Sequence, residues 1–288
     1  MKPGDTVDLF VEQVTHIDCG VLDPDTGLDG RTWLVDARLS GTRDAHGMLF
    51  DFGPARRLLK RAIDERLDHR LLVPLRAPGL SRHGDDLRLT TTRGAHIDYA
   101  GPAEGVALLD AERIGPALLA DWLTDRIAPL LPDNIDDLQL SLRAEAIDGA
   151  AYHYCHGLRS HDGNCQRMGH GHRCRLAIAV DGRDDPARAR RWAAGWQGVF
   201  IGDRADLARR DADGRHHFDY VAPQGRFALT IDAGRCVLLD GPPTVENVAA
   251  HVAAHIADTL AAELPDRHLE VRAYEGVGKG AIVCRGPA

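Results

Sequence analysis

The chain has 288 residues, which is enough for two domains of average size or for one large core. Its 44% hydrophobic and 27% charged residues exclude global disorder, and its formal net charge of -8 argues against nucleic-acid binding. No apolar run approaches the roughly 18 residues of a membrane-spanning helix, and the N-terminus carries no secretory signal. We therefore expect a cytoplasmic protein that binds no membrane.

The first half of the chain predicts two strands, a helix, a group of short strands, a second helix and a final strand. Segments rich in Val, Leu, Phe and Trp indicate the strands, and turn residues between the first two predict a long hairpin. The first helix begins at Pro54, a residue that suits the first helical position. The expected strands are 6–15, 31–39, 87–91, 95–99, 106–109 and 138–144, and the expected helices are 54–67 and 111–130.

The second half of the chain repeats this order of elements. Glu145 and Glu275 are 130 residues apart, and each follows a long predicted helix and a strand. Nearer the front of each copy, the segment that begins at Gly30 matches the segment that begins at Gly171. Ordered matches at nearly constant spacing are the signature of an internal repeat. We therefore expect two tandem α+β domains, residues 1–145 and 146–288.

Histidine is the residue type whose distribution is unusual. Five of the 15 histidines fall within residues 153–172. The six cysteines include no Cys-x-x-Cys pair, so in a reducing compartment we expect thiols rather than a disulfide framework. The histidine-rich segment is therefore the strongest candidate for a chemical site.

A metal site is the first interpretation of this segment. His170-Gly171-His172 starts a predicted strand, where the period of two puts both imidazoles on one face. On the preceding strand, 150–158, His156 shares a face with Tyr152 and Tyr154, and we favour it as the third ligand. Three imidazoles that converge from a hairpin would form an open zinc site, with one position left for water or substrate. The alternative is a polar turn that holds no metal.

The remaining histidines are less suited to a metal site. His251 and His255 are four residues apart on the last predicted helix, but they lack the glutamate of a His-Glu-x-x-His motif. We expect a packing or solvated role for this pair. We expect His161, His216 and His217 to be surface residues without a function.

Two further features admit both a catalytic and a structural interpretation. Cys165 precedes the His-Gly-His motif by a few residues, and a thiol near a bound cation can act as a base or nucleophile, or can stay inert. Asp68-His69 follows the first helix, where the pair can serve in acid–base chemistry or merely complement the helix dipole.

Several short motifs occur together in this chain: His156-Gly157-Leu158, Cys165, His170-Gly171-His172, Leu67-Asp68-His69, Pro243-Thr244-Val245-Glu246-Asn247 and Glu275. In this combination the sequence resembles the 6-pyruvoyl/6-carboxytetrahydropterin synthase family, above all its two-domain bacterial members, over most of its length. The resemblance implies tandem tunnelling-fold (T-fold) domains of ββααββ type, with antiparallel sheets that carry helices on one face. It also implies association into barrels, and hence a homo-oligomer.

The resemblance implies a role for each matched residue, and these roles together describe one active site. The zinc ligands are His156, His170 and His172; Cys165 is the catalytic thiol; Asp68 and His69 form an acid/base relay; and Glu275, or its counterpart Glu145, anchors the pterin ring.

The two copies have lost different parts of this set. In the first copy, Asp29 and Arg31 occupy the positions that match the two histidines of the His-Gly-His motif. The second copy has no Asp-His pair after its first helix. We therefore expect one composite site, with the metal ligands and the thiol from residues 146–288 and the relay from residues 1–145.

The activity implied by the resemblance is that of a zinc-dependent lyase. It would convert 7,8-dihydroneopterin triphosphate into 6-carboxy-5,6,7,8-tetrahydropterin, for queuosine or related deazapurine synthesis. Two alternatives stay open: a 6-pyruvoyltetrahydropterin synthase, which eliminates triphosphate without C–C cleavage, and a non-catalytic, zinc-stabilised pterin-binding scaffold. Four residues separate Cys165 from His170, one more than in single-domain members, so the position of the thiol is an open question.

Overall fold

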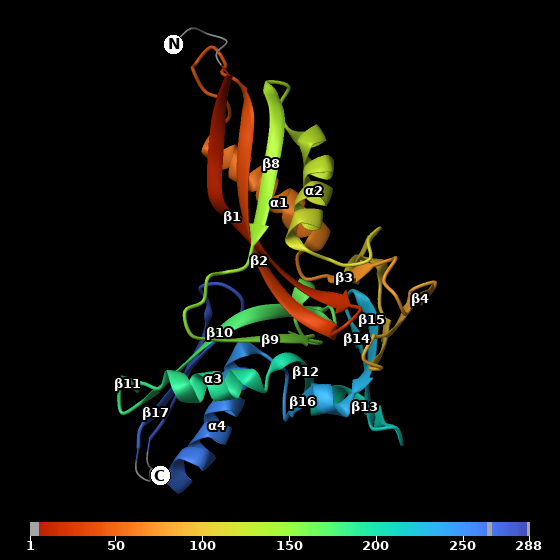
Figure 1. The fold of residues 1–288 in the computed structure, drawn as a ribbon, viewed down its shortest axis with the longest axis vertical. Helices are drawn as coiled ribbons and strands as arrows, with labels where there is room; N and C mark the ends of the chain where they lie inside the picture. Colours follow the sequence, from red (N-terminus) through yellow and green to blue (C-terminus); the bar gives the residue numbers. More distant parts are fainter. Residues whose placement is uncertain (1–5, 264–266, 287–288) are drawn as a thin grey trace. The chain divides into compact units, whose positions relative to one another are not determined.

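The structure is a computed structural model that describes residues 6–263 and 267–286 (Figure 1). Contacts divide the chain into two compact units. Unit 1 comprises the described part of Met1–Ile17 together with Trp33–Asp68 and Ile114–Glu145. Unit 2 comprises Asp18–Thr32, His69–Arg113 and the described part of Ala146–Ala288. The units differ from the predicted copies, because segments of the first half group with the second half; the copy boundaries at 145 and 146 stay a prediction.

Unit 1 is a short sheet with two helices. The parts of β1 (Thr6–Asp23) and β2 (Gly27–Thr42) that belong to it are ordered with β8 (Ile135–Arg143) as β1-β2-β8. Helix α1 (Phe52–Leu67) begins at the N-cap Asp51, whose side chain accepts a hydrogen bond from the Gly53 N–H, and it buries an apolar stripe. The predicted hairpin, first helix and final strand are all present. The helix and the final strand lie within a few residues of their expected bounds, whereas β1 continues eight residues beyond the predicted end at residue 15 and β2 begins four residues before the predicted start at residue 31.

Helix α2 (Pro116–Ile127) is shorter than the helix predicted over 111–130. It begins at Pro116 because the proline ring is preorganised for the first helical position. It ends at Ile127 because Pro129 has no N–H to continue the α-helical hydrogen bonds. Residues Ala128–Leu130 form a 3-10 turn instead.

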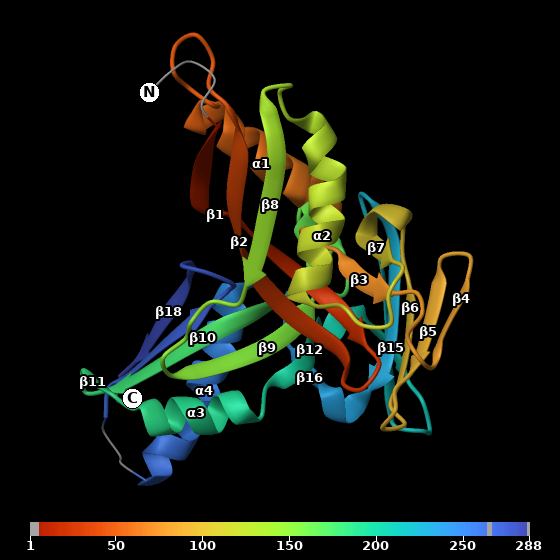
Figure 2. The ribbon, with the colours of Figure 1, turned by 45° about the horizontal axis from the view of Figure 1, so that its top comes forward.

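Unit 2 contains a seven-stranded sheet that carries the histidine-rich segment. Helix α3 (Pro186–Ala194) packs on β9 and β10, and helix α4 (Val245–Glu263) packs on β17 and β18 (Figure 2). The strand order is β16-β12-β9-β10-β17-β18, with β11 paired to β10. The bounds are β9 Ala150–His156, β10 His170–Val180, β11 Arg183–Asp184, β12 Gln197–Asp203, β16 Cys236–Leu239, β17 Leu269–Tyr274 and β18 Gly280–Arg285.

A six-stranded antiparallel sheet, also in unit 2, contains three consecutive strands from each half of the sequence. Its order is β13-β14-β15-β6-β5-β4, and the central pair, β15 and β6, connects the halves (Figure 2). In each half these three strands lie in an insertion between the two helices. The insertion begins with one strand and ends with another, and these two strands pair in parallel: β3 with β7 in the first half and β12 with β16 in the second. The bounds are β3 Leu71–Pro74, β4 Leu80–His83, β5 Asp86–Thr90, β6 His96–Ala100, β7 Val106–Leu109, β13 Leu207–Arg210, β14 Arg215–Ala222 and β15 Gly225–Asp232.

The structure confirms the α+β class and the repeated order of elements. The sequence predicted β5, β6 and β7 but did not locate β3, β4 or the strands of the second insertion. Two of the sheets are mixed rather than antiparallel, since β12 runs parallel to both β9 and β16, and β3 runs parallel to both β1 and β7. Within the described residues, no helix combines the length and the apolar character needed to cross a membrane.

Two glycines at matching repeat positions let the β1–β2 hairpin approach the β9–β10 hairpin inside unit 2. A Cβ atom on Gly30 would lie 2.0 Å from the Tyr154 carbonyl oxygen, and one on Gly171 would lie 2.7 Å from the Gly30 Cα. Real Cβ atoms do not make such contacts with backbone, so only glycine permits this packing. The close approach brings Thr32 of the first half beside the backbone of Arg173.

Replacement of Gly30 by alanine should therefore destabilise the fold. We expect Gly30→Ala to lower the free energy of unfolding by about 3 kcal/mol, because the added methyl group must push two backbones apart. Chemical denaturation would measure the change. Gly234→Ala is a matched control, since a Cβ atom there meets open space, and an equal loss of stability in both variants would contradict the prediction.

Candidate functional site

The three predicted metal ligands meet on one face of the β9–β10 hairpin. Strand register pairs His170 with His156 and His172 with Tyr154, so the period of two puts the three imidazoles together. All three histidines are fully buried or nearly so. Their candidate ligand nitrogens lie within 4.8 Å of one another, and the Nε2 atoms of His156 and His172 are 3.1 Å apart.

Oxygen atoms at the rear of the rings fix which nitrogen of each imidazole faces the cluster. His156 Nδ1 lies 2.9 Å from the Pro243 carbonyl oxygen, and His170 Nδ1 lies 2.7 Å from the Arg167 carbonyl oxygen. A carbonyl can only accept, so each Nδ1 carries the proton and each Nε2 presents its lone pair. Among the described residues, the buried Nε2 of His170 has no hydrogen-bond partner. This arrangement suits a bound cation, because converging lone pairs repel one another in its absence.

His172 is held by a carboxylate from the first half of the chain. Asp18, fully buried on β1, places Oδ1 3.3 Å from His172 Nδ1. The Thr32 hydroxyl donates to the same Oδ1 at 2.6 Å and accepts a hydrogen bond from the Arg173 N–H at 3.0 Å. A carboxylate behind a ligating histidine fixes its orientation and raises its basicity. Sequence reasoning missed Asp18, although an aspartate inside an apolar strand is a signal that could have found it.

Burial favours the neutral form of two of these imidazoles, those of His156 and His170. Desolvation lowers the pKa of His156 well below its usual range, and the neighbouring His172 acts in the same direction. Desolvation and then the adjacent His156 likewise lower the pKa of His170. Neutral imidazole is the form that binds a metal, so the cluster is prepared for a cation near neutral pH.

The predicted thiol and the relay histidine lie against this cluster. Cys165 sits in a 3-10 turn, Asn164–Gln166, within the connection between β9 and β10. The candidate ligand atoms of His69, Cys165 and His170 all lie within 4.8 Å of one another. The ring of His69 is 4.9 Å from that of His170, centroid to centroid. One chain therefore brings His69, from the first half of the sequence, to the thiol and metal ligands of the second.

His69 adopts a left-handed backbone conformation, with φ of 55°, directly after α1. Such a conformation is uncommon for a residue other than glycine and persists where the surroundings require it. Here the His69 N–H donates to the Asp18 carbonyl oxygen at 2.7 Å. Asp68 is the C-cap of α1 and the last residue of its segment of unit 1. The role of Asp68 as a relay partner stays a prediction.

The two candidate pterin anchors belong to different units. Glu275 follows β17 in unit 2, where its N–H donates to the Lys279 carbonyl oxygen and its carboxylate lies 3.9 Å from Lys279 Nζ. A Cβ atom on the next residue, Gly276, would lie 2.7 Å from Asp18 Oδ1, so this segment passes beside the carboxylate that supports His172. Glu145 follows β8 in unit 1. Unit 2 thus contains Glu275 together with the histidine cluster.

Three histidines outside the cluster have structural partners. On α4, His251 and His255 stack at 4.2 Å between ring centroids, and His255 lies 5.8 Å from the ring of Trp192, as a packing role requires. Burial lowers the pKa of His251 to about 4. His161 accepts a hydrogen bond from the Gly163 N–H.

His217 differs from the surface role that we expected. Its side chain is 15% exposed, with Nε2 2.9 Å from Asp211 Oδ2 and Nδ1 2.9 Å from the Thr230 hydroxyl. Its neighbour His216 is partly buried. The strand pairing of β13, β14 and β15 makes this network, and single-sequence periodicity does not show it.

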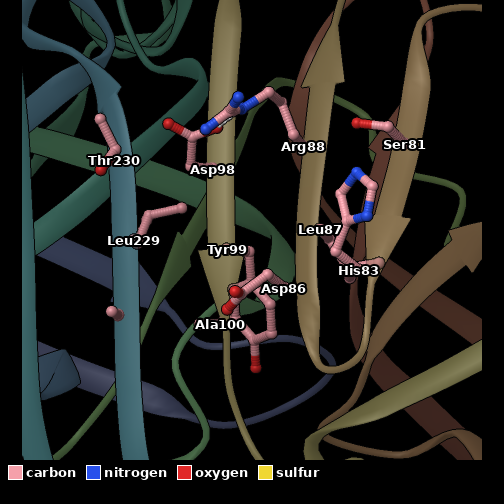
Figure 3. A pocket seen from close by; sticks show the side chains of 11 residues that line it. Ser81, His83, Asp86, Leu87, Arg88, Asp98, Tyr99, Ala100, Leu229 and Thr230 are labelled. Carbon is pink, nitrogen blue, oxygen red and sulfur yellow. Dashed lines mark hydrogen bonds and ion pairs between the residues drawn. The ribbon is translucent and has the colours of Figure 1, made fainter.

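A separate pocket of about 250 Å³ lies on the six-stranded sheet. Figure 3 shows Arg88 and Asp98 pointing toward one another from adjacent strands, joined by a 2.7 Å hydrogen bond, with Ser81 and His83 on the next strand. The pocket is lined by neither the clustered histidines nor Cys165. It is therefore distinct from the candidate site.

Comparisons with known proteins agree on one family. A family model described as 6-pyruvoyl tetrahydropterin synthase matches residues 22–142 and 148–285. Two archaeal relatives share the name "Putative 6-carboxy-5,6,7,8-tetrahydropterin synthase". The one from Pyrococcus abyssi is 24% identical over 39% of this chain and 66% of its own length, and the one from Pyrococcus horikoshii is 26% identical over 40% and 67%. The aligned part thus spans about two thirds of each relative.

Solved structures of the same description are also similar. A 6-pyruvoyl tetrahydropterin synthase from Plasmodium vivax aligns with a TM-score of 0.41 and 16% identity, covering 50% of this chain and 94% of that chain. The Plasmodium falciparum protein aligns with a TM-score of 0.41 and 15% identity, covering 48% and 91%.

Removal of the Asp18 charge should weaken metal binding. We expect Asp18→Asn to lower the zinc affinity by about 10- to 100-fold, because the amide supports His172 less well than a carboxylate. Competition with a chromophoric chelator would measure the change. Asp206→Asn is a suitable control, since Asp206 is a buried acid paired with Arg159. Unchanged affinity in Asp18→Asn would contradict the prediction.

The metal-free protein should lose stability as the pH falls below about 6.5, the ordinary pKa of histidine. Because burial lowers the pKa of His156 and His170 in the folded state, the unfolded chain binds more protons at acidic pH. The stability is therefore fully present above the unfolded pKa and is lost below it. Denaturation in the presence of a chelator, at a series of pH values, would measure this. The double variant His156→Gln/His170→Gln should show a flatter profile, and an equal slope would refute the assignment.

Proposed function

We propose that this chain, which belongs to the 6-pyruvoyl tetrahydropterin synthase family over both of its halves, is a zinc-dependent lyase acting on 7,8-dihydroneopterin triphosphate. The proposed reaction consumes one water molecule and gives 6-carboxy-5,6,7,8-tetrahydropterin, acetaldehyde and triphosphate, and it would serve queuosine or related deazapurine synthesis. The observation that carries the proposal is the buried histidine cluster with a thiol and a further histidine within 4.8 Å of one of its members.

The donor set fits zinc. His156, His170 and His172 would hold the ion through Nε2, since each Nδ1 already faces an oxygen atom. Three neutral imidazoles with one open position are typical of catalytic rather than structural zinc. Bound there, the ion would supply Lewis acidity toward the oxygen atoms of the substrate side chain.

The remaining chemistry belongs to side chains of this chain. Cys165, as a thiolate, is suited to remove and return protons along the substrate side chain. His69 lies beside it and is suited to act as the second acid or base, with Asp68 as its proposed partner. Glu275 would accept two N–H bonds from the pyrimidinone edge of the pterin, a charge-assisted contact that fixes the ring.

The site requires both halves of the sequence. The relay histidine and the carboxylate behind His172 come from the first half, while the thiol and the three imidazoles come from the second. We therefore propose that neither half is active alone. A homo-oligomer and a cytoplasmic location belong to the same proposal, and light scattering of the purified protein would measure the oligomeric state.

Turnover of the zinc-loaded protein tests the proposed function. Incubation with 7,8-dihydroneopterin triphosphate should release acetaldehyde and form 6-carboxytetrahydropterin. Cys165→Ala should lower kcat by about 100-fold or more while zinc content is unchanged, because a general base supplies a factor of that order. Cys284→Ala is a matched control, since this thiol is exposed on β18.

The alternatives give different outcomes in the same experiment. A 6-pyruvoyl product without acetaldehyde would assign the 6-pyruvoyltetrahydropterin synthase reaction, in which triphosphate is eliminated without C–C cleavage. Stoichiometric zinc with no turnover would support the non-catalytic scaffold. Equal rates in wild type and Cys165→Ala would exclude the thiol from the chemistry.

A further inference from the structure

The thiol lies on an irregular segment that needs external support. Residues 157–169 connect β9 to β10, and Cys165 occupies a single 3-10 turn within them. The connection makes four backbone hydrogen bonds of its own, including that from the Leu158 N–H to the Cys165 carbonyl oxygen at 2.8 Å, and three more that involve the side chains of His161 and Gln166. A loop of this kind gains little rigidity from its own backbone, because loops have few cooperative hydrogen bonds. The position of the Cys165 thiol therefore depends on the contacts that this loop makes with other elements.

One residue of the insertion contacts the loop on both sides of Cys165. Gln224 lies in the turn between β14 and β15, and its N–H donates to Gln166 Oε1 at 2.7 Å. Its side-chain amide donates to Asn164 Oδ1 at 2.9 Å and accepts from Arg167 Nε at 2.8 Å. Both polar atoms of the Gln224 side chain thus form hydrogen bonds. Through Gln224 the turn contacts three residues that lie within two positions of the thiol.

The same hairpin makes a fourth contact with the loop. The buried Tyr220 on β14 donates its hydroxyl hydrogen to the Gln166 carbonyl oxygen at 2.7 Å. A Cβ atom on Gly157, at the start of the loop, would lie 2.1 Å from the Tyr220 hydroxyl, so the loop backbone is pressed closely onto this side chain. The β14–β15 hairpin therefore holds the loop by a buried bond as well as by partly exposed ones.

These contacts also reach the metal-binding histidines. Arg167, whose guanidinium is held by Gln224, offers its carbonyl oxygen to His170 Nδ1 at 2.7 Å. A displacement of Arg167 would therefore turn the His170 ring as well as move the thiol.

The first half contains an equivalent set of contacts, although no candidate catalytic residue lies in the turn that is contacted. There the turn between β5 and β6 contacts the turn between β1 and β2: the Thr92 N–H donates to the Pro24 carbonyl oxygen at 2.8 Å, and the Thr92 hydroxyl donates to Asp25 Oδ1 at 2.8 Å. The connection that it contacts is short, residues 24–26. In each half, the inserted hairpin thus supports the tip of its own leading hairpin, and in the second half that tip carries Cys165.

We propose that the β14–β15 hairpin is a clamp that positions the thiol, with Gln224 and Tyr220 as positioning residues for Cys165. The effect of the clamp on catalysis rests on the proposed function, whereas its effect on the position of the loop does not. A nucleophile or base displaced by about 1 Å can lose about 100-fold in rate, so a thiol on an irregular loop needs such support. The insertion thereby acquires a role in the reaction although it supplies no reacting group.

The test compares two variants of one hairpin. Gln224→Ala/Tyr220→Phe removes three of the four bonds and keeps the ring volume of residue 220. Arg226→Ala is the matched control, because Arg226 is exposed on the same hairpin and pairs with Asp219 instead of the loop. Hydrogen exchange of residues 158–168 and alkylation of Cys165 by iodoacetamide, resolved by peptide mass spectrometry, are the readouts. Cys284, which is exposed, is an internal reference for the reagent.

We expect the double variant to exchange its loop amides and to alkylate Cys165 about tenfold faster than wild type, with Cys284 unchanged. On 7,8-dihydroneopterin triphosphate, kcat should fall about tenfold while zinc content is retained. The control should match wild type in every readout. Exchange and alkylation equal to wild type in the double variant would overturn the clamp. An inactive wild type would overturn the proposed function instead, and the exchange and alkylation data would still decide the clamp.

Discussion

Three buried imidazoles whose Nε2 lone pairs converge are the constraint on which the rest of unit 2 depends. Such an arrangement is unfavourable unless every Nδ1 has an acceptor and the lone pairs have a cation. The oxygen atoms that face these nitrogens come from three separate parts of the chain: the Pro243 carbonyl before α4, the Arg167 carbonyl in the loop and, at 3.3 Å, the Asp18 carboxylate on β1. The site therefore exists only when these elements are packed together.

The first half of the chain has lost its own histidine cluster but supports the cluster of the second half. Asp18 contacts His172 through its carboxylate and holds the His69 backbone through its carbonyl oxygen. The approach of the two hairpins at Gly30 and Gly171 makes this possible, because a side chain at either position would separate them. The second half thus supplies the clustered histidines, and the first half supplies groups that lie against them.

Each half of the chain contains an insertion of five strands between its two helices. In each insertion the first strand pairs in parallel with the last, and the strands between them join those of the other insertion in one six-stranded sheet through β15 and β6. The buried faces of these strands form a core with Tyr99, Phe218 and Phe227. That core gives the turn containing Gln224 a rigid base, which a surface loop alone would not have.

Sequence by itself determined the local features of this protein. The period of two placed His170 and His172 on one face, the helical spacing located α1, and the ordered matches revealed the repeat; His156 was only the favoured third ligand until the strand register paired it with His170. These patterns depend on neighbours a few residues away. Tertiary structure alone decided which side chains orient the ligands, where Cys165 stands and how the insertions pair. Asp18 and His172, or Gln224 and Asn164, are far apart in sequence, and their contacts depend on how whole sheets pack, which no local periodicity encodes.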